Sequence, residues 1–133
     1  SLSNPCQREI KSLVVIEDET DNRELLQTLL MMDGFLVEGA GDGVTGIELI
    51  LQTLPDAAIV DIGLPGKTGY EVAREVREQL GQGIYLIALT GYGQTQDVRR
   101  AMDAGFDVHL VKPLDPASLL RLLSSEESST ANQ

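Results

Sequence analysis

Four short apolar runs in this chain each end at a polar residue of a kind that carries chemistry. The polar residues that follow the runs LVVI, AAIV, YLIAL and VHLV are Glu17 with Asp18, Asp61, Thr90 and Lys112. If the runs are parallel strands, their carboxyl ends gather three carboxylates, a hydroxyl and an ammonium group at one edge of a sheet. Three anions within a few ångströms repel one another. We therefore expect cations among them, namely Lys112 and a divalent metal ion with oxygen ligands.

The composition is that of one globular domain. With 133 residues, of which 42% are hydrophobic and 23% charged, the chain can bury a single core without disulfides. Its one cysteine, Cys6, cannot form an internal disulfide, which fits a reducing, cytoplasmic location. No apolar run is long enough to cross a bilayer, although a parent protein could be membrane-anchored. The net charge of -11 would repel nucleic acid and anionic lipid, so we expect contact with neither.

Strand-like apolar runs alternate with helix-like periods, which is typical of βαβ units in a parallel sheet. The predicted strands span residues 12–17, 35–40, 57–62, 84–89 and 107–111. A first helix ends near Gly34 and begins at a cap formed by Thr20 or Asp21. The later helices span residues 44–54, 69–80 and 95–104, and a last one follows Asp115 and Pro116.

The alternation predicts an α/β fold in which helices cover both faces of a five-stranded parallel sheet, a doubly wound, flavodoxin-like three-layer sandwich. For the strand order 2-1-3-4-5, the order reverses between the first and third strands, and Asp18 and Asp61 meet there. We expect this domain to span residues 11–125. Residues 1–10 would be a leader or linker, and residues 126–133 a polar tail or linker.

Asp61 is the expected centre of the chemistry, as a carboxylate nucleophile that accepts a phosphoryl group. The alternative is a strand-end aspartate that caps a loop. Glu17 and Asp18 are expected to hold Mg²⁺, with a solvated acidic turn as the alternative. Thr90 and Lys112 offer a hydroxyl donor and a cation for phosphoryl oxygens.

These residues give the chain a family resemblance. The motifs EDE, VDIGLPGKTGYE, LTGYG and LVKP, at this spacing over residues 11–125, resemble the receiver domain of bacterial two-component response regulators. The resemblance implies that a sensor histidine kinase or a histidine phosphotransfer domain passes a phosphoryl group to Asp61. It also implies that Asp18 binds Mg²⁺ directly, Glu17 binds it through water, and the backbone carbonyl of Gly63 is a further ligand. Thr90 and Lys112 match the residues that contact the phosphoryl group.

Two positions depart from the family pattern. Glu17 replaces the first of two usual aspartates, and its longer side chain would tune metal binding rather than abolish it. His109 stands where the family commonly has Tyr or Phe, whose side chain turns inward as the threonine moves. A histidine at this switch position would add a dependence on pH near neutrality. A surface histidine without a signalling role is the alternative. Gly63 and Tyr92 would flank the site.

The resemblance implies a regulatory phosphoacceptor domain and not an enzyme. The combination of DIGLPG, GFD and HLVKP is closest to the receivers of hybrid histidine kinases. The face formed by residues 95–104, the last strand and the last helix would change on phosphorylation, and could form a homodimer. This face carries Arg99, Arg100 and His109.

Three other classes share parts of the pattern. A haloacid-dehalogenase-type phosphatase would need a second aspartate at the position of Gly63. A flavin mononucleotide binder would need a phosphate-cradling loop where the chain has three carboxylates. A receiver fold kept as a docking module, without phosphorylation, is the remaining alternative.

Overall fold

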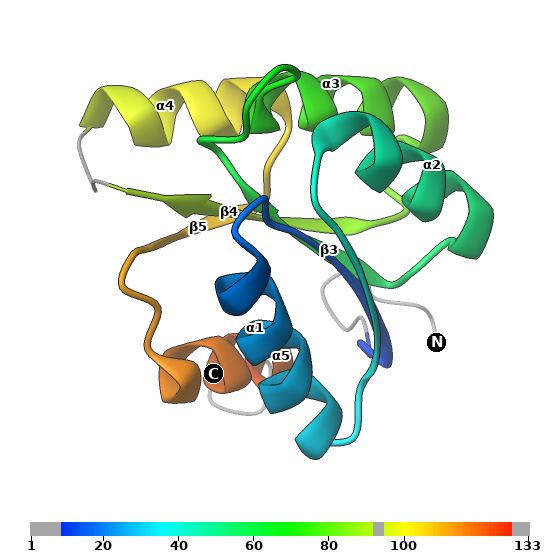
Figure 1. The fold of residues 1–133 in the computed structure, drawn as a ribbon, viewed down its shortest axis with the longest axis vertical. Helices are drawn as coiled ribbons and strands as arrows, with labels where there is room; N and C mark the ends of the chain where they lie inside the picture. Colours follow the sequence, from blue (N-terminus) through cyan, green and yellow to red (C-terminus); the bar gives the residue numbers. More distant parts are fainter. Residues whose placement is uncertain (1–8, 92–94, 129–133) are drawn as a thin grey trace.

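The structure is a computed structural model that describes residues 9–91 and 95–128. Five parallel strands form one sheet in the order β2-β1-β3-β4-β5 (Figure 1). The strands are β1 (Ser12–Ile16), β2 (Leu36–Ala40), β3 (Ala57–Asp61), β4 (Tyr85–Thr90) and β5 (Val108–Val111). The helices are α1 (Thr20–Met32), α2 (Gly43–Thr53), α3 (Gly69–Leu80), α4 (Thr95–Ala104) and α5 (Pro116–Ser128). The predicted α/β fold and strand order are confirmed.

Helices cover both faces of the sheet, so the molecule has three layers. α2, α3 and α4 lie on one face, and α1 and α5 lie on the other (Figure 1). Each face has its own apolar core, and the alternation of side chains along a strand divides β3 between the two cores. Every residue of β3 and β4 is buried, as expected of central strands under helices on both sides. In the described part of the chain, no helix has the length and apolarity needed to span a membrane.

The predicted ends of the strands and of α2 agree with the structure to within one residue and those of α3 and α4 match it, but one cap was predicted wrongly. The N-cap of α1 is Glu19, whose side chain accepts a hydrogen bond from the Asn22 backbone N–H at 3.0 Å. The backbone is still extended at Glu19 and Thr20 is already helical, so neither Thr20 nor Asp21 stands at the cap position. α5 continues to Ser128, into the segment predicted as a tail. Cys6 and residues 129–133 lie outside the described residues.

A close contact between α2 and β1 fixes the end of β1 and therefore the start of the polar edge. Asp42 caps α2 by accepting a hydrogen bond from the Thr45 backbone N–H at 2.8 Å. One turn into the helix, a Cβ atom on Gly46 would overlap the side chain of Ile16, the last residue of β1. Ile16 is completely buried, so it has little room to move.

Gly46→Ala should therefore destabilise the protein. Alanine is about 1 kcal/mol better than glycine in a helix interior, but overpacking a core costs about 1–3 kcal/mol. We expect urea denaturation to show a net loss of stability for Gly46→Ala. Ile16→Val removes the methyl group nearest to the new Cβ and should reduce the loss caused by Gly46→Ala. Losses that simply add in the double variant would contradict this explanation.

Candidate functional site

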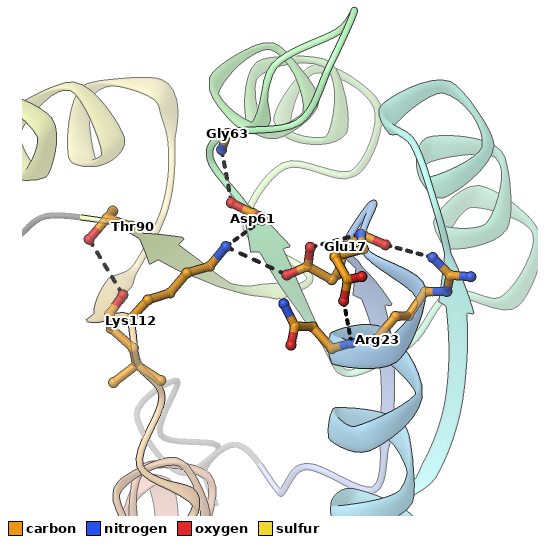
Figure 2. A network of polar contacts seen from close by, with 9 residues as sticks. Glu17, Arg23, Asp61, Gly63, Thr90 and Lys112 are labelled. Carbon is orange, nitrogen blue, oxygen red and sulfur yellow. Dashed lines mark hydrogen bonds and ion pairs between the residues drawn. The ribbon is translucent and has the colours of Figure 1, made fainter.

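The carboxyl edge of the sheet brings the predicted polar residues together. Glu17 follows β1, Asp61 ends β3, Thr90 ends β4 and Lys112 follows β5. All four line one cavity of about 500 Å³, and Asp18 and Gly63 line it as well. Figure 2 shows Lys112 reaching from the β5 side toward Asp61 and Glu17. Six residues predicted from four separate parts of the sequence thus share one cavity.

Lys112 is the cation that holds the two buried carboxylates. Its Nζ lies 2.6 Å from Asp61 Oδ2 and 3.6 Å from Glu17 Oε1 (Figure 2). The side chains of Asp61 and Glu17 are 7% and 4% exposed, whereas that of Lys112 is 35% exposed. Buried carboxylates are costly unless they are paired and hydrogen-bonded. The ion pairs with Lys112 offset this cost and leave the ammonium group open to the cavity.

The other oxygen of Asp61 is held by the backbone. Asp61 Oδ1 accepts a hydrogen bond from the Gly63 N–H at 2.9 Å. The start of α3 lies directly against this segment, since a Cβ on Gly69 would be 2.7 Å from the Asp61 carbonyl oxygen and from Ile62 Cα. Only glycine permits this approach without a shift of backbone. Both oxygens and the main chain of Asp61 are thus positioned before any ligand arrives.

Glu17 is held by groups that sequence reasoning did not identify. Its Oε2 accepts a hydrogen bond from the Glu19 N–H at 3.0 Å, and its carbonyl oxygen accepts one from Arg23 Nη1 at 2.8 Å. Arg23 lies in the first turns of α1. No sequence pattern indicates this contact, because it depends on the direction in which α1 leaves the end of β1.

The electrostatics of the site follow from burial and pairing. Burial raises the pKa of Glu17 above its ordinary value, and the nearby Asp61 carboxylate raises it further, against the lowering effects of the Glu19 N–H and Lys112. Burial alone would lower the pKa of Lys112, but its pairing with Asp61 and Glu17 outweighs burial and raises that pKa. Lys112 therefore stays protonated at neutral pH.

Three carboxylates are placed to bind one metal ion. Glu17, Asp18 and Asp61 each offer an oxygen atom, and these atoms lie within 4.8 Å of one another. Carboxylate oxygens suit Mg²⁺, and the exposed Asp18 leaves space for the water molecules that Mg²⁺ retains. The donor set therefore fits the ion. The role of the Gly63 carbonyl stays a prediction.

Of the two predicted switch residues, Thr90 lines the cavity and His109 does not. Thr90 is 2% exposed, and its hydroxyl makes a long contact of 3.5 Å with the Leu110 carbonyl oxygen. His109 is half-buried on β5 in register with Ala88. Among the described residues that line the cavity, His109 is absent, so its switch role stays a prediction. Tyr92 lies outside the described residues.

The raised pKa of Glu17 predicts that the contribution of this residue to stability falls as pH rises. A carboxyl group with a raised folded-state pKa stabilises the fold below its ordinary value of 4.5 and loses that contribution as pH rises through the raised value. In metal-free protein, Glu17→Gln should therefore gain stability relative to the parent between about pH 4 and pH 7. Urea denaturation of both proteins at the two pH values measures this difference in stability. The exposed Glu24→Gln is the matched control, and an equal pH response in the two variants would refute the explanation.

Comparison with known proteins agrees with the fold and gives the family. The family model for the response regulator receiver domain matches residues 13–124. The transcriptional regulatory protein DltR of Streptococcus agalactiae is 40% identical over 108 residues, which cover 81% of this chain and 48% of that protein. An uncharacterised 14.6 kDa protein of Leptolyngbya boryana is 34% identical over 112 residues, or 84% of this chain and 86% of that protein.

Solved structures give the same result. A putative response regulator from Chloroflexus aurantiacus superimposes with a TM-score of 0.82 at 28% identity, covering 90% of this chain and 99% of that one. The Vibrio cholerae chemotaxis protein CheY4 gives a TM-score of 0.82 at 26% identity, with 87% and 98% covered. The chain spans about half the length of DltR but most of the Leptolyngbya protein. By sequence and strand order, it belongs to the receiver domain family of two-component response regulators.

Proposed function

We propose that this domain accepts a phosphoryl group on Asp61 from a phosphohistidine donor in the presence of Mg²⁺, and that phosphorylation alters a protein-binding surface. The observation that carries the proposal is the arrangement around Asp61. A buried carboxylate is paired with Lys112 and lies beside two further carboxylates, in a cavity open to solvent. A purely structural aspartate does not need this arrangement.

The transfer would form one bond and break another. A carboxylate oxygen of Asp61 attacks phosphorus, the phosphorus–nitrogen bond of the donor phosphohistidine breaks, and the imidazole nitrogen keeps the electron pair. The product is an acyl phosphate. Because Lys112 pairs with Asp61 Oδ2, that oxygen becomes available when the ammonium group moves to a phosphoryl oxygen. The flexible stem of lysine permits this exchange.

Thr90 and Lys112 would bind the phosphoryl oxygens that face them. The long contact between the Thr90 hydroxyl and Leu110 leaves this donor free to be exchanged for a stronger, charge-assisted bond. Mg²⁺, held by Glu17, Asp18, Asp61 and the Gly63 carbonyl, would neutralise part of the charge on the phosphoryl group. In this account the residues act by positioning and charge, which are the main requirements of phosphoryl transfer.

An apolar groove supports a protein as the donor. A cavity of about 510 Å³ lies between α1 and the segment that joins β5 to α5, with leucine and proline side chains along its walls. It reaches Glu17 and Lys112 at the phosphoacceptor end. We infer that a sensor histidine kinase or a histidine phosphotransfer domain docks there. Its apolar side chains would enter the groove while its phosphohistidine faces Asp61.

The output would be regulatory and not catalytic. We propose that the face of α4, β5 and α5, with Arg99, Arg100 and His109, changes on phosphorylation and is where a homodimer would form. We also propose an origin in a hybrid histidine kinase, from the sequence resemblance, and a cytoplasmic location, because the single cysteine fits a reducing compartment. The domain limits at residues 11 and 125 belong to this proposal as well, with α5 continuing beyond the second limit to Ser128.

Incubation with Mg²⁺ and acetyl phosphate tests the proposal. Intact mass spectrometry should show one added phosphoryl group on the parent protein, and none when Mg²⁺ is chelated. Asp61→Asn should abolish the adduct, whereas Asp103→Asn, the same change on the exposed side of α4, should leave it intact. A folded parent that binds Mg²⁺ but takes no phosphoryl group from acetyl phosphate or a phosphohistidine donor would favour the docking module.

A further inference from the structure

One wall of the phosphoacceptor cavity comes from α4, which none of the chemistry above uses. Asp97, in the first turn of α4, lines the cavity together with Asp61, Thr90 and Lys112. It is half-buried. The cavity thus contains two acidic residues beyond the three that are placed to bind a metal ion, Asp97 and Glu19, and the carboxylate of Glu19 already caps α1.

A contact between α4 and α3 holds this wall in place. The guanidinium carbon of Arg100 lies 4.2 Å from the centre of the Tyr70 ring, within the range of a cation–π contact. Tyr70 is 6% exposed and lines the same cavity. It follows Gly69, whose backbone lies against Asp61. Since Asp97 and Arg100 are three residues apart on a helix, they share one face, and the contact with Tyr70 keeps that face over the cavity.

The charge of Asp97 acts in opposite directions on the two groups that the cavity would bind. A negative potential attracts a divalent cation and repels a phosphoryl group, which carries a charge of about -1.5 to -2 at neutral pH. Inside a partly enclosed cavity this effect is screened less than at an open surface. Asp97 would therefore strengthen metal binding and weaken retention of the phosphoryl group.

We propose that Asp97 is an electrostatic determinant of the phosphoacceptor site, which sets the balance between metal and phosphoryl binding, and that Arg100 positions it through Tyr70. The inference rests on the proposed function of Asp61. By reciprocity, a phosphoryl group on Asp61 repels Asp97 and so acts directly on α4. Phosphorylation would thus affect α4 without requiring a movement of Thr90 or His109.

A simpler role for Asp97 makes a different prediction. An acidic residue in the first turn stabilises a helix through its dipole. If that were its whole role, Asp97→Asn would loosen α4, and the two affinities would fall together or stay unchanged. Opposite changes in the affinities for a cation and an anion cannot come from a loss of structure alone.

Isothermal titration calorimetry on the whole chain separates these roles. The probes are Mg²⁺ alone and then beryllofluoride, an anionic mimic of the phosphoryl group, at saturating Mg²⁺. For Asp97→Asn we expect Mg²⁺ affinity to fall and beryllofluoride affinity to rise, each about two- to fivefold, as for one charge that acts across a hydrated cavity. Asp97→Glu, which keeps the charge, should resemble the parent. Asp103→Asn, on the exposed side of the same helix, should change neither affinity.

The positioning role of Arg100 has its own test. In an Arg100→Ala background the effects of Asp97→Asn should shrink, whereas in an Arg99→Ala background, which loses the same charge, they should persist. Equal effects in both backgrounds would overturn the role of Arg100. Affinities that move in the same direction, or that do not move, would overturn the inference while leaving the proposed function intact. A parent that binds Mg²⁺ but no beryllofluoride would overturn both.

Discussion

The ammonium group of Lys112, held between the buried carboxylates of Asp61 and Glu17, is the interaction on which the rest of the site depends. Its position comes from the sheet. The Lys112 N–H donates to the Thr90 carbonyl oxygen at 2.8 Å, which continues the pairing of β4 with β5 beyond the end of β5. The same backbone bond therefore sets the place of the cation and of the hydroxyl residue. Without this cation, the two carboxylates would be buried without the charge that compensates them.

Close packing of helices against the sheet also positions the ends of β1 and β3. α2 approaches β1 over Gly46 and α3 approaches Asp61 over Gly69, and neither approach has room for a Cβ. Because the central strands are buried on both faces, small movements of a helix are transmitted to the polar edge. The geometry of the site therefore depends on the packing of the whole fold. Its open side, at Asp18 and Lys112, stays available to ligands.

The sequence was sufficient to predict the five-stranded sheet and its polar edge, because strand-like runs alternate with helix-like periods and four of the five strands are apolar runs that end at or just before a polar residue. It was not sufficient for contacts that depend on how a helix is oriented. Arg23 on Glu17 and Arg100 on Tyr70 depend on helix orientation, which no periodicity encodes. Glu19 was not predicted as the N-cap of α1, because the cap is the residue at which the backbone changes from extended to helical and the sequence did not locate that change. The Lys112–Pro113 peptide bond is cis, which a proline permits but does not require.

Among the clustered carboxylates, Asp61 is the one that we propose takes the phosphoryl group. Borohydride reduction of the phosphorylated protein, followed by peptide mass spectrometry, tests this directly, since reduction converts an aspartyl phosphate to homoserine. Our account predicts homoserine at position 61 and unchanged residues at positions 17 and 18. Homoserine at position 18, or reduction of Glu17, would show that the charges around Lys112 serve a different acceptor and would contradict the account.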